Sequence, residues 1–212
     1  LAIALWLCPK QSSQIYETLN SLIIGINPLF EDAPRFEPHI TITSQLSINS
    51  MSDVNTVLNS CVAALAGGPE MDIELTFNSL KINHKNSYFK KIYLSLLKTK
   101  NLASLATIIR ELYVEFPNLQ NQAESKYAAQ DWCNEIFDPH LSLVYTNLTH
   151  FDNALIRTIK TRVEDLLNTD TLSLEDDELL EYNLGWTNGA LKIVRCEGPV
   201  EEWQVLGKVD IH

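Results

Sequence analysis

The spacing of apolar residues divides the chain into short strands and amphipathic helices. Apolar residues at every second position predict strands over residues 1–8, 37–46, 71–82, 89–97 and 138–146, with a further strand near 171–174. Apolar residues three or four apart predict helices with buried stripes over 19–26, 54–65, 102–116 and 155–166. Ser52 or Asp53 is expected to cap the second helix, and Thr149 the fourth. Residues 118–136 show neither period, so we expect a polar, irregular insertion that is either a lid or a plain surface loop.

The order of these elements occurs twice along the chain. Each half has the order strand, helix, strand, helix, strand, which predicts a duplicated α+β unit with an approximate two-fold axis. Near the C-terminal end, Asn188-Gly189 has the composition of a tight turn and predicts a hairpin between 180–187 and 190–196. Residues 199–211 predict a short helix and a strand. Because no long linker separates the halves, we expect residues 1–212 to form one domain with interleaved lobes.

The second strand of each half begins with the same seven-residue pattern. The two copies are Phe36-Glu37-Pro38-His39-Ile40-Thr41-Ile42 and Phe137-Asp138-Pro139-His140-Leu141-Ser142-Leu143. Alternation in a strand places His39 and Thr41 on one face, and His140 and Ser142 likewise, while the aliphatic residues face a core. The histidine and the hydroxyl are then roughly 6–7 Å apart, at about 3.3 Å per residue. Two such strands can hold one tetrahedral phosphate from both sides.

This set of side chains suits the hydrolysis of a phosphate ester without a metal ion or other cofactor. Imidazole titrates near neutral pH, so one histidine can act as the base on water and the other as the acid on the leaving oxygen. Thr41 and Ser142 can donate hydrogen bonds to the phosphate oxygens. The two-fold arrangement makes the histidine roles exchangeable, and our working assignment is His140 as base and His39 as acid. The competing interpretation, ordinary strand residues with solvated hydroxyls, would hold for a single His-x-Thr but is disfavoured by the duplicate.

The duplicated motif resembles the 2H phosphoesterases, and its flanks resemble most closely the fungal 2′,3′-cyclic-nucleotide 3′-phosphodiesterases. The stretches that carry this resemblance are residues 2–6, 36–44 and 139–145. The resemblance implies a two-lobe fold in which antiparallel sheets and outer helices surround a central cleft. It also implies that 2′,3′-cyclic phosphates are opened to 2′-phosphates. The fungal branch implies a further substrate, ADP-ribose 1″,2″-cyclic phosphate from tRNA splicing, which is converted to ADP-ribose 1″-phosphate.

Two aromatic residues are candidates for contact with the substrate. Trp6 alternates with the small residues Ala2, Ala4 and Cys8, which leaves room for a flat base to stack on it, although a core position is an equally good interpretation. Tyr145 matches an aromatic residue that contacts the nucleotide in plant relatives. Strict alternation places it on the face opposite Ser142, so it can line the cleft only if the strand ends or bulges before it.

Charge limits the class of partner. The net charge is −11 at pH 7, which argues against a long nucleic acid held on a basic surface and favours a small cyclic-phosphate nucleotide. Residues 75–110 contain six lysines and no acid, which indicates either a solvated face or a local positive field near the phosphate. The alternative functions are RNA end processing or 2′–5′ ligation on the same fold, which the charge disfavours, and a nucleotide-binding module without turnover.

The remaining features concern compartment and assembly. The four cysteines show no Cys-x-x-Cys pairing, which favours reduced thiols in an intracellular, cytoplasmic protein over a zinc site or a disulfide scaffold. Residues 1–8 lack the basic lead of a secretory signal, and no apolar run approaches the roughly 18 residues of a membrane span. We expect a monomer without a transmembrane segment, and the fungal resemblance adds Golgi association.

Overall fold

The computed structural model describes residues 2–67, 72–85, 87–169 and 184–212. Its strands form a single antiparallel arrangement in the order β6-β3-β4-β5-β2-β1-β7-β8. The strands are β1 (Ile3–Cys8), β2 (Ile40–Thr43), β3 (Glu74–Ile82), β4 (Ile92–Leu96), β5 (His140–Val144), β6 (Gly185–Thr187), β7 (Gly189–Arg195) and β8 (Gln204–Ile211). The two strands that carry the repeated motif, β2 and β5, are therefore neighbours at the middle of the sheet.

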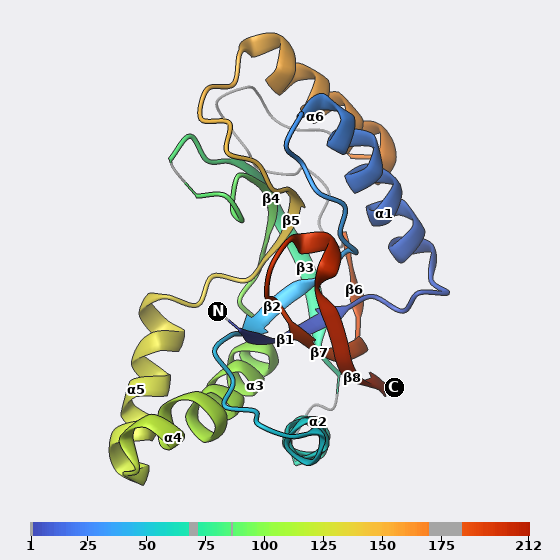
Figure 1. Cartoon of the computed structure of the whole chain (residues 1–212). Coiled ribbons are helices and arrows are strands. Elements are labelled where there is room, and N and C mark those ends of the chain that lie inside the picture. Colours follow the sequence, from blue (N-terminus) through green and yellow to red (C-terminus); the bar gives the residue numbers. More distant parts are fainter. Residues whose placement is uncertain (1, 68–71, 86, 170–183) are drawn as a thin grey trace.

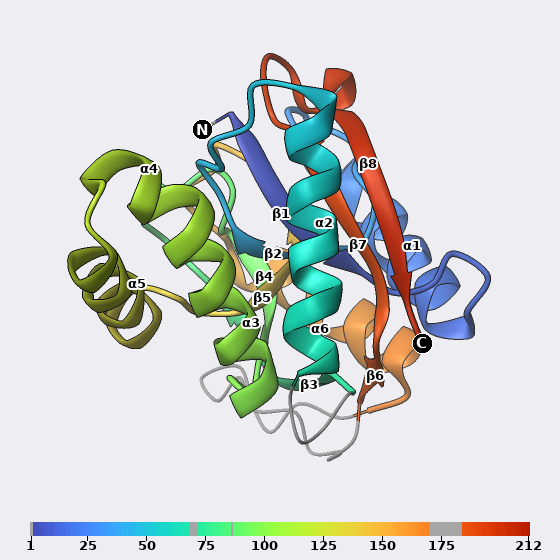
Figure 2. The same cartoon turned by 90° about the horizontal axis from the view of Figure 1, so that it is seen from below.

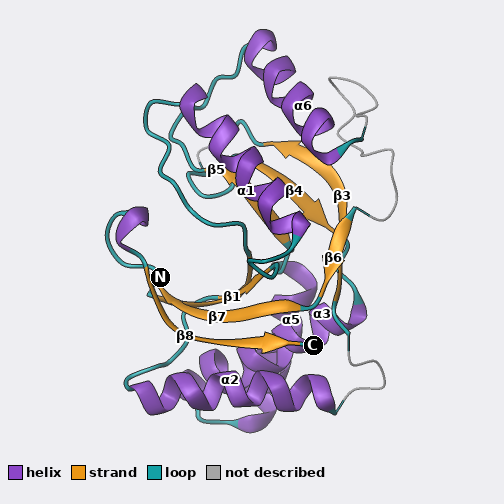
Figure 3. Cartoon of the chain, turned by 90° about the vertical axis from the view of Figure 1, so that its right-hand side faces the viewer, coloured by secondary structure: helices purple, strands orange, loops and turns teal. Residues whose placement is uncertain are grey.

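Helices cover the sheet in two groups, seen above and below the strands in Figure 1. The helices are α1 (Gln14–Ile26), α2 (Met51–Ala66), α3 (Lys100–Arg110), α4 (Phe116–Leu119), α5 (Gln122–Glu135) and α6 (Asn153–Leu167). Helix α1 packs on α6 and β5, while α2 packs on α3, β7 and β8, with α3 against β2 (Figures 2 and 3). Helix α1, which follows β1, thus packs on β5 of the other half, and α3, which follows β4, packs on β2. No helix in the described ranges is both long enough and apolar enough to cross a membrane.

The arrangement confirms the predicted duplicated α+β fold. Strand β1 lies beside β2, and β4 lies beside β5, so the order β4-β5-β2-β1 is symmetric about the β2–β5 pair. Most of the buried apolar side chains form one cluster between the sheet and the helices. The strand expected near 171–174, which would complete the second half, lies outside the described residues.

Both predicted helix caps are wrong, and the actual caps lie a few residues away. Ser50, not Ser52 or Asp53, caps α2, because its hydroxyl accepts from the Asp53 N–H while the Asp53 carboxylate accepts from the Ser50 N–H. Asp152, not Thr149, caps α6, since its carboxylate accepts from the Leu155 N–H at 2.8 Å. In both helices the sequence offers more than one capping residue, namely Ser50, Ser52 and Asp53 for α2 and Thr149 and Asp152 for α6.

The predicted irregular insertion over 118–136 is also wrong, because most of it is α5. The residues that α5 buries are Ser125, Ala129 and Cys133, which lie four apart on one face but are small and partly polar. Asn121 caps this helix by accepting from the Glu124 N–H at 3.0 Å. A helix that packs through small residues leaves no apolar stripe in the sequence, so its period could not be detected.

The helix predicted over 102–116 is interrupted by a π-helical turn at Glu111–Glu115 between α3 and α4. Pro117 has no N–H to donate to the Tyr113 carbonyl one turn earlier. That carbonyl instead accepts from the Ser47 N–H at 2.8 Å. A contact from a distant loop therefore satisfies the group that the proline leaves unpaired.

The predicted C-terminal hairpin is wrong as well. Asn188 (φ 60°) and Gly189 (φ 126°) do adopt left-handed backbone, but β6 pairs with β3 and β7 pairs with β1 and β8. At this turn Asn188 forms two hydrogen bonds with Ile73. The Ile73 N–H donates to the Asn188 side chain, and the Ile73 carbonyl accepts from the Asn188 N–H. The chain thus passes from β6, at one end of the strand order, to β7, the next-to-last strand at the other end, which requires the sheet to curl.

We expect Gly189→Ala to lower the free energy of unfolding by more than about 1 kcal/mol, because the native backbone there is incompatible with a side chain. A Cβ at this position would lie 2.1 Å from the Cys8 carbonyl oxygen. Gly25→Ala is the control, since it lies in α1 with open space around it and should gain about 0.5–1 kcal/mol. Urea unfolding measures the free energy of unfolding of both variants. Equal values for Gly189→Ala and Gly25→Ala would contradict the close backbone contact described at Gly189.

Candidate active site

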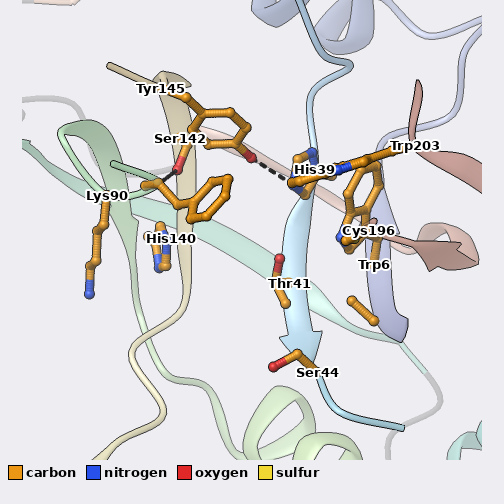
Figure 4. Close-up of a pocket in the computed structure, with 12 residues that line it drawn as sticks. Trp6, His39, Thr41, Ser44, Lys90, His140, Ser142, Tyr145, Cys196 and Trp203 are labelled. Carbon is orange, nitrogen blue, oxygen red and sulfur yellow. Dashed lines mark hydrogen bonds between the residues drawn. The ribbon is translucent and has the colours of Figure 1, made fainter. Parts of the chain in front are cut away.

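The pairing of β2 with β5 places the four motif side chains on one face. Ile40 pairs directly with Leu141, and both are fully buried on the core side. The residues on either side of this pair point the opposite way. His39, Thr41, His140 and Ser142 accordingly line one pocket of about 240 Å³ (Figure 4). The structure therefore brings together the four residues that the sequence analysis selected as catalytic.

The two histidines are held in the same way. In each motif the Nδ1 atom lies 2.8 Å from the carbonyl oxygen two residues earlier, that of Glu37 for His39 and of Asp138 for His140. Because a carbonyl oxygen only accepts, each Nδ1 must carry the hydrogen. Each neutral ring therefore keeps its lone pair on Nε2, the nitrogen that can exchange a proton in the pocket.

The acidic residue of each motif is fixed by a lysine. The Lys192 Nζ lies 2.8 Å from the Glu37 carboxylate, which also accepts from the Tyr16 hydroxyl at 3.2 Å. The Lys90 Nζ lies 2.6 Å from the Asp138 carboxylate. These contacts hold the residue whose carbonyl orients each imidazole, so they help to set the orientation of both rings.

Burial keeps both imidazoles neutral near pH 7. It lowers the pKa of His39 to about 4, to which His140 and Lys192 contribute smaller charge repulsions. Burial also lowers the pKa of His140, with nearby Lys90 acting in the same direction. The pKa of Tyr145 is raised by burial, so its hydroxyl stays protonated and donates to the His39 Nε2 atom at 3.3 Å.

The two hydroxyls of the motifs differ in their contacts. Thr41 is half-buried and points into the pocket, and its hydroxyl has no hydrogen-bond partner among the described residues (Figure 4). The Ser142 hydroxyl donates to the Phe89 carbonyl at 2.8 Å. It must rotate away from that carbonyl before it can donate to a phosphate oxygen.

Tyr145 lines the pocket, because β5 ends at Val144, one residue before it. This is the condition under which the sequence analysis allowed it to do so. Its ring stacks on Phe36 of the first motif, with centroids 4.0 Å apart. Tyr145 thus connects the end of one motif strand to the beginning of the other.

Trp6 also lines the pocket, but its surroundings match neither of the two sequence interpretations fully. Its ring stacks on His39, with centroids 3.6 Å apart and planes at 12°, and only 5% of the residue is exposed. The ring packs with Ala4, Cys8 and Val194 in a small apolar cluster on the pocket side of the sheet. Its main contact is therefore with a motif histidine.

Six further pocket residues were not assigned to the site from the sequence, namely Ala4, Ser44, Phe89, Lys90, Cys196 and Trp203. They come from segments far apart in the chain, so no local spacing joins them. Phe89 begins the strand predicted over 89–97, and the alternation there gives no reason to place it in a pocket. Trp203 stands between the polar residues Glu202 and Gln204, which is a usable signal.

Of the lysine-rich segment, Lys90 alone lines the pocket among the described residues. Lys91 is fully buried and donates to the Lys85 carbonyl, and Lys98 donates to the Cys133 carbonyl. The interpretation as a local positive field thus applies to one lysine. No group of three histidine, cysteine or carboxylate side chains that could hold a metal ion is found in the described part of the chain.

Comparisons with known proteins agree over the whole chain. A family model described as "Cyclic phosphodiesterase-like protein" matches residues 1–211. A protein of Eremothecium gossypii named 2′,3′-cyclic-nucleotide 3′-phosphodiesterase is 40% identical over 224 residues, covering 100% of both chains. Proteins with the same name from Yarrowia lipolytica (38% identical, 99% of this chain and 100% of that protein) and Saccharomyces cerevisiae (37%, 100% of both) are also similar. A crystal structure of a phosphoesterase covers 99% of this chain and 97% of its own with a TM-score of 0.50; at 10% identity, it supports the fold alone.

Proposed function

The chain belongs to the family of cyclic phosphodiesterase-like proteins, and we propose that it opens cyclic phosphates by hydrolysis without a metal ion. The substrates we propose are nucleoside 2′,3′-cyclic phosphates, which give 2′-phosphates, and ADP-ribose 1″,2″-cyclic phosphate from tRNA splicing, which gives ADP-ribose 1″-phosphate. The observation that carries this proposal is the pair of histidines in one pocket, each with Nδ1 donating to a carbonyl so that the lone pair is on Nε2. The Tyr145 hydroxyl, which donates to the His39 Nε2 atom, must turn away before that atom can transfer a proton.

In the proposed reaction, water adds to phosphorus while the bond to the 3′ oxygen breaks. One Nε2 atom takes a proton from the water, and the other gives a proton to the departing 3′ oxygen. A cyclic phosphate suits this small apparatus because the leaving group stays attached to the product. In this proposal Thr41 donates to the phosphate oxygens, and so does Ser142 once its hydroxyl turns away from the Phe89 carbonyl. Lys90, which is paired with Asp138, adds a positive charge at the wall of the pocket.

Our working assignment keeps His140 as base and His39 as acid. The acid must be protonated in the enzyme–substrate complex, although burial holds the pKa of free His39 at about 4. An anionic phosphate beside the ring favours the imidazolium and so raises that pKa. Substrate binding and protonation of one histidine are therefore expected to be coupled.

This coupling predicts the pH dependence. Turnover needs one neutral and one protonated histidine, so kcat/KM should fall at low pH when both are protonated and at high pH when both are neutral. Because both pKa values of the free protein are lowered from 6.5, both limbs of kcat/KM should lie below pH 6.5. The alkaline limb of kcat should lie at higher pH, because bound phosphate raises the pKa of the acid. Initial rates between pH 3.5 and 9 give both profiles, and an alkaline limb of kcat/KM above pH 7 would contradict this account.

The activity itself is tested by incubating the protein with ADP-ribose 1″,2″-cyclic phosphate or 2′,3′-cyclic AMP, with EDTA or with added Mg²⁺. We expect the same rate in both conditions, and the monoester products can be identified by phosphorus NMR. Binding without product would favour a nucleotide-binding module. Activity that is lost in EDTA and restored by metal would overturn the mechanism.

A further inference from the structure

A second cavity, separate from the candidate active site, lies beside the end of β1. It has a volume of about 450 Å³, and its charged lining residues are Lys10, Lys192, Lys208 and Asp210. We call it the lysine cavity. Its three lysines contrast with the net charge of −11 for the whole chain. A cavity in which positive side chains outnumber negative ones favours an anionic ligand.

The lysine cavity lies on the same face of the sheet as the candidate active site. Trp6 of β1 pairs with Thr41 of β2 on one side and with Lys192 of β7 on the other. Lys192 pairs in turn with Lys208 of β8. Directly paired residues point to the same face of a sheet, so these four side chains form one row across it. With strands about 4.8 Å apart, the backbones of Lys192 and Lys208 are roughly 10 and 14 Å from that of Thr41.

The three ammonium groups of the lysine cavity differ in their partners. The Lys192 Nζ is paired with the Glu37 carboxylate at 2.8 Å. The Lys10 Nζ lies 3.2 Å from the His212 Nδ1 atom, which must accept because an ammonium group can only donate. Lys208 is exposed and has no hydrogen-bond or ion-pair partner among the described residues. Lys10 and Lys208 are therefore available to an anion that enters the cavity.

We propose that the lysine cavity binds a phosphate or diphosphate group carried at the 5 position of the ribose whose cyclic phosphate is opened. The inference rests on the proposed function, since it takes the cyclic phosphate to lie between the two histidines. ADP-ribose 1″,2″-cyclic phosphate carries such a diphosphate at its 5″ position. Nucleoside 2′,3′-cyclic phosphates with a free 5′-hydroxyl carry none. The cavity therefore favours the first class of substrate over the second.

The distances allow one ligand to reach both places. At about 1.2 Å per bond in an extended chain, a 5-diphosphate reaches roughly 8–11 Å from the cyclic phosphorus. This is comparable to the separation of the lysine backbones from Thr41, and the long lysine side chains add to the reach. Ammonium groups form charge-assisted hydrogen bonds with phosphate oxygens. The Asp210 carboxylate repels the same anion, so we expect a moderate gain in affinity.

The test compares adenosine 2′,3′-cyclic phosphate with the same compound carrying a 5′-diphosphate. In the wild type at low salt, we expect the 5′-diphosphate to lower KM by about 5- to 20-fold. Lys208→Gln and Lys10→Gln should each reduce this ratio of KM values by about 2- to 5-fold, and about 0.5 M NaCl should reduce it as well.

The matched control is Lys126→Gln. This lysine is exposed on α5 and lines neither cavity, so its variant should show the same ratio of KM values as the wild type. Lys192 is not a suitable test residue, because it also holds Glu37, whose carbonyl orients the His39 ring.

Equal KM values for the two compounds in the wild type would overturn the proposal while leaving the activity standing. A ratio of KM values that neither lysine variant changes would also overturn it, because the 5′-diphosphate then binds elsewhere. Titration with inorganic diphosphate distinguishes a free anion as the ligand. If it binds more weakly to Lys208→Gln than to the wild type while the two KM values are equal, the cavity takes a free anion and the assignment to the substrate is wrong.

If the wild type opens no cyclic phosphate, the proposed function fails, and binding tests the cavity separately. Adenosine 2′-phosphate with a 5′-diphosphate should then bind about 5- to 20-fold more tightly than adenosine 2′-phosphate, and Lys208→Gln should reduce the difference. Equal Kd values for the two ligands in the wild type would contradict the lysine cavity as a phosphate site.

Discussion

His39→Ala and His140→Ala are each expected to lower kcat by about 10²–10⁴-fold, because each removes one of the two proton-transfer groups. The double variant should be little worse than the more damaged single variant, since the two groups act in one step. His150→Ala is the control, as this histidine is exposed and lies outside the pocket. Steady-state kinetics with 2′,3′-cyclic AMP measures the loss, and near-normal kcat in either variant would disprove the acid–base pair.

The same variants separate the two roles. A p-nitrophenyl phosphodiester has a leaving group that departs without protonation, so it does not need the general acid. If His39 is the acid, His39→Ala should retain most of its activity on this ester, whereas His140→Ala should lose activity on both substrates. The opposite result would exchange the roles and leave the pair intact. His39 stacks on Trp6, so thermal unfolding should be measured to separate lost chemistry from lost packing.

Thr41→Val and Ser142→Ala are each expected to lower kcat by about 10²–10³-fold, by comparison with the loss of a single donor to a developing oxyanion. KM should change less, because these hydroxyls act mainly as charge builds on phosphorus. Thr158→Val on α6 is the control, since its exposed hydroxyl donates only to the Ala154 carbonyl one turn earlier.

A Thr41→Val variant with unchanged kcat would remove the hydroxyl from the mechanism. Ser142→Ala also leaves the Phe89 carbonyl without its donor, so a fall in stability is expected there and not in Thr41→Val. Thermal unfolding of the two variants distinguishes these effects.

The face of β2 and β5 on which the motif residues lie was predictable, because the alternation of side chains in a strand depends only on neighbouring residues. Ile40 and Leu141 alternate with the motif residues, and this alone predicts that the histidines and hydroxyls share a face opposite the core. The duplication then indicated symmetric placement, and the family resemblance is confirmed by the match over residues 1–211. The roles of the four side chains remain predictions.

The parts that sequence reasoning missed depend on contacts between distant segments. Asn188-Gly189 has the composition of a hairpin turn, but its partner is Ile73, more than a hundred residues earlier. Trp203 and Phe89 meet only because the sheet curls, and nothing in their neighbours along the chain predicts that contact. Tyr145 was undecided because alternation cannot indicate where a strand ends.

The most direct test is a crystal structure of the protein with a bound nucleoside 2′-phosphate. We predict that a single phosphate lies with its oxygens about 3 Å from both the His39 and the His140 Nε2 atoms, within reach of the Thr41 and Ser142 hydroxyls. A phosphate bound to one histidine only, or outside the pocket between β2 and β5, would contradict the shared site.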